Sequence, residues 1–344
     1  PGALDSMKKA LVTDINGQDG SFLAELLLAK GYEVFGVWVK GRVGDTQNLP
    51  HIADQLHIFD ASDTQGLLLA ELIKRIQPQE VYHLNAPLRR SHALKIDEVE
   101  PHAAATLHML EAIRLYSPKT KFFQSVSPEI YGHVTSLPIQ EETPFYPVSS
   151  HGVAELYAVW MVRNFRETYG VFACNGILFS HTSTRCKTQC LTQEIAGALG
   201  EIARGRKNVL KLSNLDIVRD WGYAGDYATA MWKMLQEPSA EDFVIATGEG
   251  RSVREFVTIC GEKLGMDLVW EGQGKEEKGY DALTGKLVVE VCPPFHRRIE
   301  TDLLGCAKKA KRQLDWEPQT TFDSWVDELL QSYVKVSQDH FQHA

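Results

Sequence analysis

The 344-residue sequence has no hydrophobic run long enough to cross a membrane, and we expect no signal peptide. It also has no excess of positive charge, since its formal net charge is −9. Polyanions repel an acidic protein, so this charge argues against a nucleic acid or a membrane surface as a partner. Internal repeats and low-complexity segments are absent as well. These absences favour a globular protein that acts on a small molecule.

The six cysteines include no Cys-x-x-Cys pair. Cys186 and Cys190 have a loose metal-ligand spacing, but no second pair of ligands stands near them in the sequence. We therefore expect reduced thiols and no metal, which fits a reducing, cytoplasmic location.

What the sequence does contain is a regular alternation of short apolar stretches and amphipathic helical patterns. Strands are predicted at 8–13, 32–37, 56–60, 80–84, 121–125 and 173–178. Helices are predicted between them at 21–30, 64–76, 100–116 and 149–169. Strands separated by helices of this length predict an α/β fold, a Rossmann-type doubly wound parallel sheet.

Beyond residue 180 the alternation becomes irregular. Helices are predicted at 191–204, 224–236, 252–264, 303–314 and 321–335, and strands at 208–212, 243–246 and 287–291. The polar, glycine-rich stretch 272–285 predicts a loop. No clean linker is present, so we expect a Rossmann-type lobe at 7–180 and a smaller substrate-binding lobe, mainly 181–340, laced into it. Residues 1–6 look like an expression-vector remnant.

A glycine-bearing turn lies between the first strand and the first helix. Glycines in such a turn let the backbone approach a pyrophosphate, which the N–H groups of the helix N-terminus then face. The Gly-x-x-Gly-x-x-Gly spacing of extended dehydrogenases fits Gly17 and Gly20 but places a third glycine at position 14, where the sequence has Asp14. A carboxylate there opposes pyrophosphate binding. Alternatively, Asp14 caps the helix or turn and no dinucleotide binds.

Five segments resemble the GDP-mannose 4,6-dehydratase family of extended short-chain dehydrogenases/reductases. They are TDINGQDGS at 13–21, QEETPFYP at 140–147, NGILF at 175–179, RDWG at 219–222 and EDFVIATG at 241–248. The resemblance covers nearly all of 7–335. It implies a lobe that binds NADP or NAD, a second lobe that binds a nucleotide sugar, a cleft between them, and a homodimer or homotetramer.

The resemblance also implies a set of site residues. The family's reaction oxidises the sugar at C4, removes water across C5 and C6, and returns the hydride to C6. Its Tyr-x-x-x-Lys pair maps onto His151 and Glu155, and the assisting Thr and Glu map onto Ser127 and Glu129. The implied cofactor site comprises Gly17, Gln18, Asp19, Gly20, Lys40 and Asp60, and the implied substrate site comprises Ser180, Glu194 and Arg219.

Several of these positions depart from the family's pattern. The arginine pair for the NADP phosphate maps onto Val39 and Lys40, and a substrate-site lysine maps onto Glu194. Together with Asp14 and Glu155, these changes argue against nicotinamide binding.

Three hypotheses stay open. His151 and Glu155 lie on one face of a helix, where a carboxylate orients an imidazole. With Ser127 and Glu129 they form a set for non-redox proton transfer, such as elimination, isomerisation or cyclisation, and we favour this repurposed enzyme. An ordinary solvated helical pair explains the same spacing. The second hypothesis is an inactive homologue that binds a ligand or an oligomeric partner, and the third is an active NADP-dependent dehydratase.

The helix predicted at 149–169 offers a contact face for an oligomer. Tyr157, Trp160 and Met161 of the helix predicted at 149–169 fit such a face, and they fit the protein core equally well.

Overall fold

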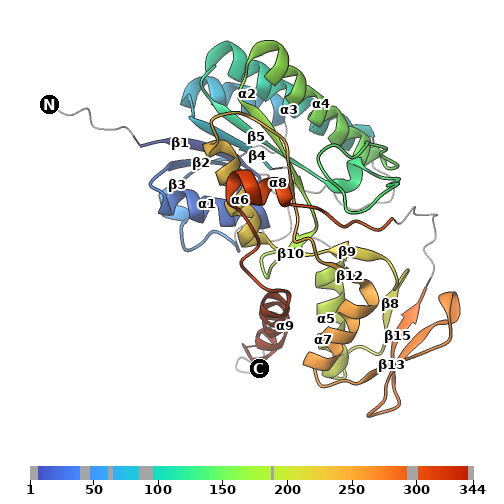
Figure 1. The fold of residues 1–344 in the computed structure, drawn as a ribbon. Coiled ribbons are helices and arrows are strands. Elements are labelled where there is room, and N and C mark those ends of the chain that lie inside the picture. Colours follow the sequence, from blue (N-terminus) through green and yellow to red (C-terminus); the bar gives the residue numbers. More distant parts are fainter. Residues whose placement is uncertain are drawn as a thin grey trace.

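The structure, a computed structural model, describes residues 7–38, 47–60, 65–84, 96–186, 190–292 and 301–339. Lys40, of the predicted cofactor site, and the preceding Val39 lie outside these ranges. Within them, a seven-stranded parallel sheet has the order β11-β6-β5-β4-β1-β2-β3 (Figure 1). Its strands are β1 (Lys9–Thr13), β2 (Glu33–Trp38), β3 (Leu56–Asp60), β4 (Glu80–His83), β5 (Lys121–Val126), β6 (Ala173–Leu178) and β11 (Phe243–Ile245). The predicted fold class is confirmed.

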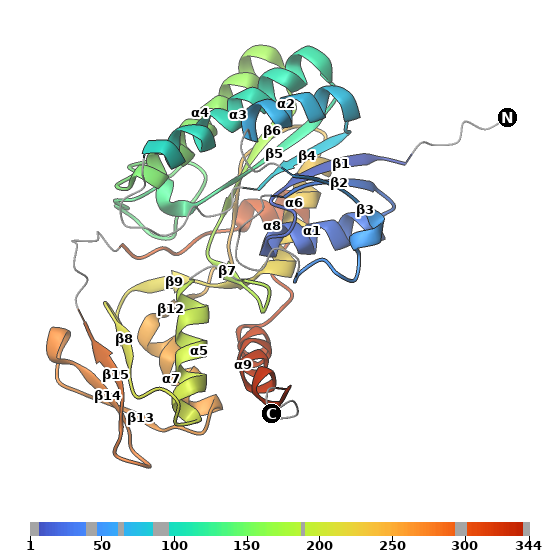
Figure 2. The same cartoon turned by 180° about the vertical axis from the view of Figure 1, so that it is seen from behind.

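Helices cover both faces of this sheet (Figures 1 and 2). One face carries α2 (Gln65–Ile76), α3 (Ile96–Tyr116) and α4 (Ser150–Tyr169). The other carries α1 (Gln18–Ala29), α6 (Ala224–Gln236) and α8 (Lys308–Leu314). The strand order reverses between β1 and β4, and ligands of doubly wound folds bind outside the carboxyl ends of the strands at such a point.

A smaller lobe lies beside the carboxyl ends of the parallel strands (Figure 2). Its sheet has the order β13-β14-β15-β8, formed by β13 (Leu268–Glu271), β14 (Lys278–Asp281), β15 (Leu287–Val291) and β8 (Leu210–Leu212). The helices α5 (Leu191–Ala203), α7 (Val253–Lys263) and α9 (Phe322–Asp339) enclose its core with this sheet. Two short pairs join the lobes: β7 (His181–Thr182) with β10 (Gly222–Tyr223), and β9 (Val218–Asp220) with β12 (Gly250–Ser252).

The loop predicted at 272–285 is wrong in part, because it contains β14 and the short 3-10 helix η3 (Gly274–Glu276). The strand β14 lies between β13 and β15 and pairs antiparallel with both. A Cβ on Gly279 would lie 2.9 Å from Cζ3 of Trp270, so glycine lets this strand pack against the tryptophan ring. The local composition favours a loop, but tertiary pairing makes it a strand.

The helix predicted at 303–314 begins only at Lys308. The preceding residues are extended, because Leu303 forms two backbone hydrogen bonds with β9. Its amide donates to the carbonyl oxygen of Val218 at 3.1 Å, and its carbonyl oxygen accepts the amide N–H of Asp220 at 3.0 Å. The predicted start of α3 at residue 100 is also late, since the helix begins at Ile96.

Candidate functional site

The helix α4 begins at the carboxyl-end side of the sheet, next to the end of β5. Ser149 caps it, because its hydroxyl oxygen accepts the amide N–H of Gly152 at 3.0 Å. The same hydroxyl donates to Oε2 of Glu129 at 2.9 Å. A Cβ on Gly152 would lie 2.7 Å from the carbonyl oxygen of Glu129, so glycine permits this close approach. The first turn of α4 is therefore fixed against the segment that follows β5.

That segment is a short 3-10 helix, η2 (Pro128–Ile130), capped by Ser127, whose hydroxyl accepts the amide N–H of Glu129 at 3.2 Å. The amide N–H of Ser127 donates to Oε2 of Glu155 at 3.0 Å. The other carboxylate oxygen of Glu155 lies 3.9 Å from Nε2 of His151. The structure thus brings all four predicted catalytic residues into one cluster.

Burial distinguishes the two members of the His-Glu pair. The side chain of Glu155 is 1% exposed, whereas that of His151 is 21% exposed. An ordinary solvated helical pair, the alternative that the spacing left open, does not describe a carboxylate this deeply buried. A buried carboxylate held by a backbone amide provides a fixed partner for the more accessible imidazole.

The turn between β1 and α1 brings backbone atoms so close together that it requires glycine. Helix α1 begins at Gln18, earlier than the predicted residue 21, because the extended backbone of Gly17 forms its N-cap. A Cβ on Gly20 would lie 2.3 Å from the carbonyl oxygen of Asp14, so only glycine fits there. Asp14 itself has a φ of 50°, a left-handed conformation that glycine adopts freely and aspartate tolerates.

The side chain of Asp14 turns toward the start of α1. A Cβ on Gly17 would lie 2.4 Å from Oδ2 of Asp14, which places the carboxylate against the N-cap of the helix. A helix N-terminus attracts anions through its N–H groups and its dipole. The protein's own negative charge therefore lies where a phosphate would be expected.

A second ion pair anchors the first turn of α1. Nε2 of His181 lies 2.9 Å from Oδ2 of Asp19, and Nδ1 lies 2.7 Å from the carbonyl oxygen of Phe179. Burial opposes charge on both side chains, but their mutual attraction outweighs it, lowering the pKa of Asp19 and raising that of His181. The His181 ring also stacks on Tyr227, with ring centroids 4.4 Å apart.

The residues after His181 hold α1 as well. The hydroxyl of Ser183 donates to Oε1 of Gln18 at 2.9 Å. The guanidinium of Arg185 pairs with Glu25 at 2.7 Å and lies over the ring of Phe22 at 3.9 Å. No local pattern in the sequence predicts these contacts, since the partners lie more than 150 residues apart.

The predicted substrate residues do not join the cluster around Glu155. The carbonyl oxygen of Ser180 accepts the amide N–H of Gly222 at 2.9 Å. Glu194 is exposed in the first turn of α5. Nη1 of Arg219 donates to the carbonyl oxygens of Val218 at 2.9 Å and Thr301 at 2.7 Å, so this side chain braces the segment leading to α8. Asp60, of the predicted cofactor site, ends β3 and is exposed.

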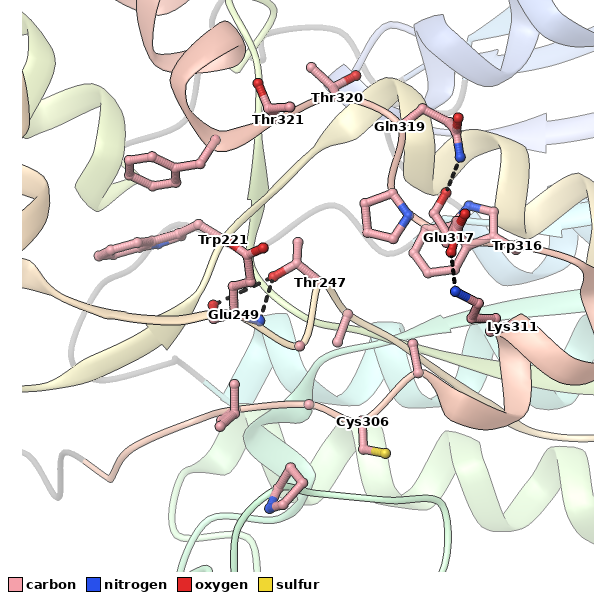
Figure 3. A pocket seen from close by; sticks show the side chains of 18 of the residues that line it. Trp221, Thr247, Glu249, Cys306, Lys311, Trp316, Glu317, Gln319, Thr320 and Thr321 are labelled. Atoms are coloured by element: carbon pink, nitrogen blue, oxygen red, sulfur yellow. Dashed lines mark hydrogen bonds and ion pairs between the residues drawn. The ribbon is translucent and has the colours of Figure 1, made fainter.

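A cavity of about 640 Å³ lies between the β11–β12 loop and the chain that joins α8 to α9 (Figure 3). Trp221, Thr247, Trp316 and Thr320 are among its lining residues. Lys311 and Glu317 form an ion pair beside it, at 2.5 Å (Figure 3). Among the described residues that line it, none is a predicted catalytic, cofactor or substrate residue.

No helix in the ranges that the structure describes is long and apolar enough to cross a membrane. Nor do the described residues contain three or more His, Cys, Asp or Glu side chains grouped to hold a metal ion.

Comparison with known proteins agrees with the fold and with the quoted motifs. A family model described as GDP-mannose 4,6 dehydratase matches residues 11–329. The chain belongs to this family. A GDP-mannose 4,6-dehydratase of Vibrio cholerae is 42% identical over 355 residues, covering 97% of this chain and 95% of the relative. The Homo sapiens GDP-mannose 4,6 dehydratase is 41% identical over 340 residues, covering 95% and 91%.

Solved structures of other sugar-nucleotide enzymes share the fold. A UDP-glucose 4-epimerase of Thermotoga maritima matches with a TM-score of 0.79 and 20% identity, covering 96% of this chain and 99% of the other. A dTDP-glucose 4,6-dehydratase of Bacillus anthracis, solved with NAD, matches with a TM-score of 0.79 and 21% identity, covering 96% and 98%.

Proposed function

We propose that the chain is an enzyme that moves protons on a nucleotide-linked sugar without a hydride cycle, with His151 as the proton-transferring group. The observation that carries this proposal is the buried Glu155, fixed by the amide of Ser127 and facing His151. The carboxylate lies within ion-pair distance of the imidazole, 3.9 Å from Nε2, so a base and a fixed charged partner face each other as acid–base catalysis requires. Membership of the family supports an enzyme and a nucleotide-sugar substrate.

The substrate class follows from the acidity of carbon-bound hydrogen. An imidazole removes such a proton only when a neighbouring carbonyl stabilises the carbanion as an enolate. We therefore propose a nucleotide-linked keto sugar, such as the 4-keto-6-deoxy product of the family's reaction. His151 takes the proton beside the ketone, and reprotonation at carbon yields an isomer or an exchanged substrate.

A solvent-exchange experiment tests this role. The full chain is incubated in deuterium oxide with GDP-4-keto-6-deoxymannose, and NMR follows the hydrogens next to the ketone. We expect exchange with the wild type and a loss of about 100-fold or more with His151→Ala. His57→Ala is the matched control, because His57 forms a similar pair with Glu33 at 3.2 Å on the far edge of the sheet. Equal exchange rates in the wild type and in properly folded His151→Ala would refute the role.

The residues at the turn between β1 and α1, together with Glu155, do not fit a nicotinamide dinucleotide bound as the resemblance implies. The carboxylate of Asp14 lies at the N-cap of α1. At the position where the family has a lysine that binds the ribose, this chain has the buried Glu155. Because structural neighbours were solved with NAD, an active dehydratase is the competing proposal. Calorimetric titration with NADP, NADPH, NAD, NADH, GDP and GDP-mannose separates the two. Tight nicotinamide binding would favour the dehydratase.

The exposed face of α4 favours an additional role in oligomerisation. Val153, Tyr157 and Trp160 follow one another at helical spacing and are 56%, 39% and 51% exposed. Met161, by contrast, packs against the core. We infer that Val153, Tyr157 and Trp160 contact a second copy in a homodimer or homotetramer. Trp160→Glu is expected to shift the sedimentation coefficient toward the monomer, and Leu283→Glu, on the smaller lobe and 71% exposed, is expected to leave it unchanged.

A further inference from the structure

Two thiols meet where the smaller lobe contacts the first Rossmann helix. Sγ of Cys186 lies 3.0 Å from Sγ of Cys190. Cys190 is the N-cap of α5, and both side chains are partly exposed. Cys186 follows Arg185, whose contacts with α1 hold that part of the chain in place. The pair is therefore positioned from both sides.

The surroundings of Cys190 favour its thiolate. The hydrogen bond from the Cys186 thiol is the largest cause, and it lowers the pKa of Cys190 to about 6 against the opposing effect of burial. Oγ1 of Thr192 lies 3.5 Å from the sulfur and supports the charge. Among the residues that the structure describes, His181, whose positive charge favours the thiolate, and Tyr333 also interact with Cys190. The attacking thiol and the resolving thiol are thereby distinguished.

We propose that Cys186 and Cys190 form a reversible dithiol–disulfide site that reacts with low-molecular-weight disulfides. The Cys190 thiolate attacks one sulfur of the small disulfide, whose S–S bond breaks, and one small thiol leaves after taking up a proton. Cys186 then loses its proton and attacks the Cys190 sulfur, which releases the second small thiol. The protein dithiol loses two electrons and two protons, and the small disulfide gains them.

The required movement is small. An S–S bond is about 2.05 Å long, so the two sulfurs approach by about 1 Å. The bond links the segment that holds α1 to the first turn of α5. The proposal does not rest on the proton-transfer chemistry proposed above, because Cys190 caps α5 and Cys186 precedes it, whereas His151 and Glu155 belong to α4.

The test uses the full-length chain, oxidised glutathione as the probe, and intact-mass and peptide-mass measurements. We expect the wild type to lose two hydrogen atoms and to keep no glutathione on these residues. Cys186→Ser is expected to trap a stable glutathione adduct on Cys190, because the resolving thiol is gone. Cys292→Ser, which removes another partly exposed cysteine, is expected to form the Cys186–Cys190 disulfide like the wild type.

The pH dependence adds an independent readout. At pH 6 about half of Cys190 is thiolate, compared with about 0.3% of an ordinary thiol of pKa about 8.5. A thiolate of lower pKa is also a weaker nucleophile, which reduces this advantage of Cys190 by roughly tenfold. We therefore expect the wild type to react about tenfold faster at pH 6 than Cys190→Ser, in which only the Cys186 thiol of the pair remains. Retention of glutathione on both residues of the wild type, or equal rates with Cys190→Ser, would overturn the proposal.

Discussion

Replacing Asp14 tests the proposal that this side chain opposes dinucleotide binding. Its carboxylate lies against the N-cap of α1, where the phosphates of a dinucleotide would approach to on the order of 5 Å. Two unit charges at that distance repel by about 3 kcal/mol at an effective dielectric constant of about 20. Salt and solvent screen part of this repulsion, which leaves about 1.5 to 3 kcal/mol. Asp14→Gly should therefore raise NADP affinity roughly ten- to a hundredfold.

Two variants separate charge from shape. Asp14→Asn removes the charge but keeps the volume, and asparagine tolerates the left-handed φ of 50° at this position. Asp14→Gly removes the charge and the side chain, and it should also raise the free energy of unfolding by up to about 1 kcal/mol, because glycine adopts that φ without strain. Calorimetry measures affinity, and urea denaturation measures stability.

The pattern of results identifies the cause. If charge repulsion dominates, both variants gain affinity to a similar extent. If the side chain blocks the site sterically, only Asp14→Gly gains. Unchanged NADP affinity in both variants would refute the reasoning, and Glu155 would then be the next residue to change.

Two further changes probe the packing around the site. Asp19→Asn removes the partner of His181. The lowered pKa of Asp19 contributes stability that is lost as the pH falls below about 4. The raised pKa of His181 contributes stability that is lost as the pH rises above 6.5. Because the variant lacks this ion pair, its free energy of unfolding should depend less on pH between pH 5 and 8 than that of the wild type. Gly152→Ala should cost about 1–3 kcal/mol by denaturation, whereas the helical control Gly200→Ala, whose nearest contact is 3.5 Å, should cost nothing.

Elements with strong local signals were predicted well from the sequence. The strand β3 and the helix α6 have the predicted boundaries, because apolar periodicity and turn residues mark both ends. The strand β14 was missed because pairing with its neighbours, rather than its own composition, stabilises it. The extended residues before α8 were missed for the same reason, since their hydrogen bonds go to β9.

For the candidate site, helical spacing and the family resemblance predict which residues take part, but not their burial or their long-range partners. Spacing placed His151 and Glu155 on one face of α4, but the burial of Glu155 depends on the backbone of Ser127 and could not be derived from it. The pair of Asp19 and His181 joins residues 162 positions apart. No periodicity links such positions, so only the folded chain reveals them.

The glycines of the first turn illustrate why a retained motif is not by itself evidence for a ligand. A Cβ on Gly20 would collide with the backbone of Asp14 at 2.3 Å, and one on Gly36 would lie 2.4 Å from Ile15. Glycine is therefore required at both positions by the packing of α1 and β2 against the turn, whether or not a pyrophosphate binds. The residue that discriminates is Asp14, because glycine adopts its φ more readily and its side chain places a carboxylate at the N-cap of α1. Family membership accounts for the fold, and the proposal of a different chemistry rests on the side chains at Asp14, His151 and Glu155.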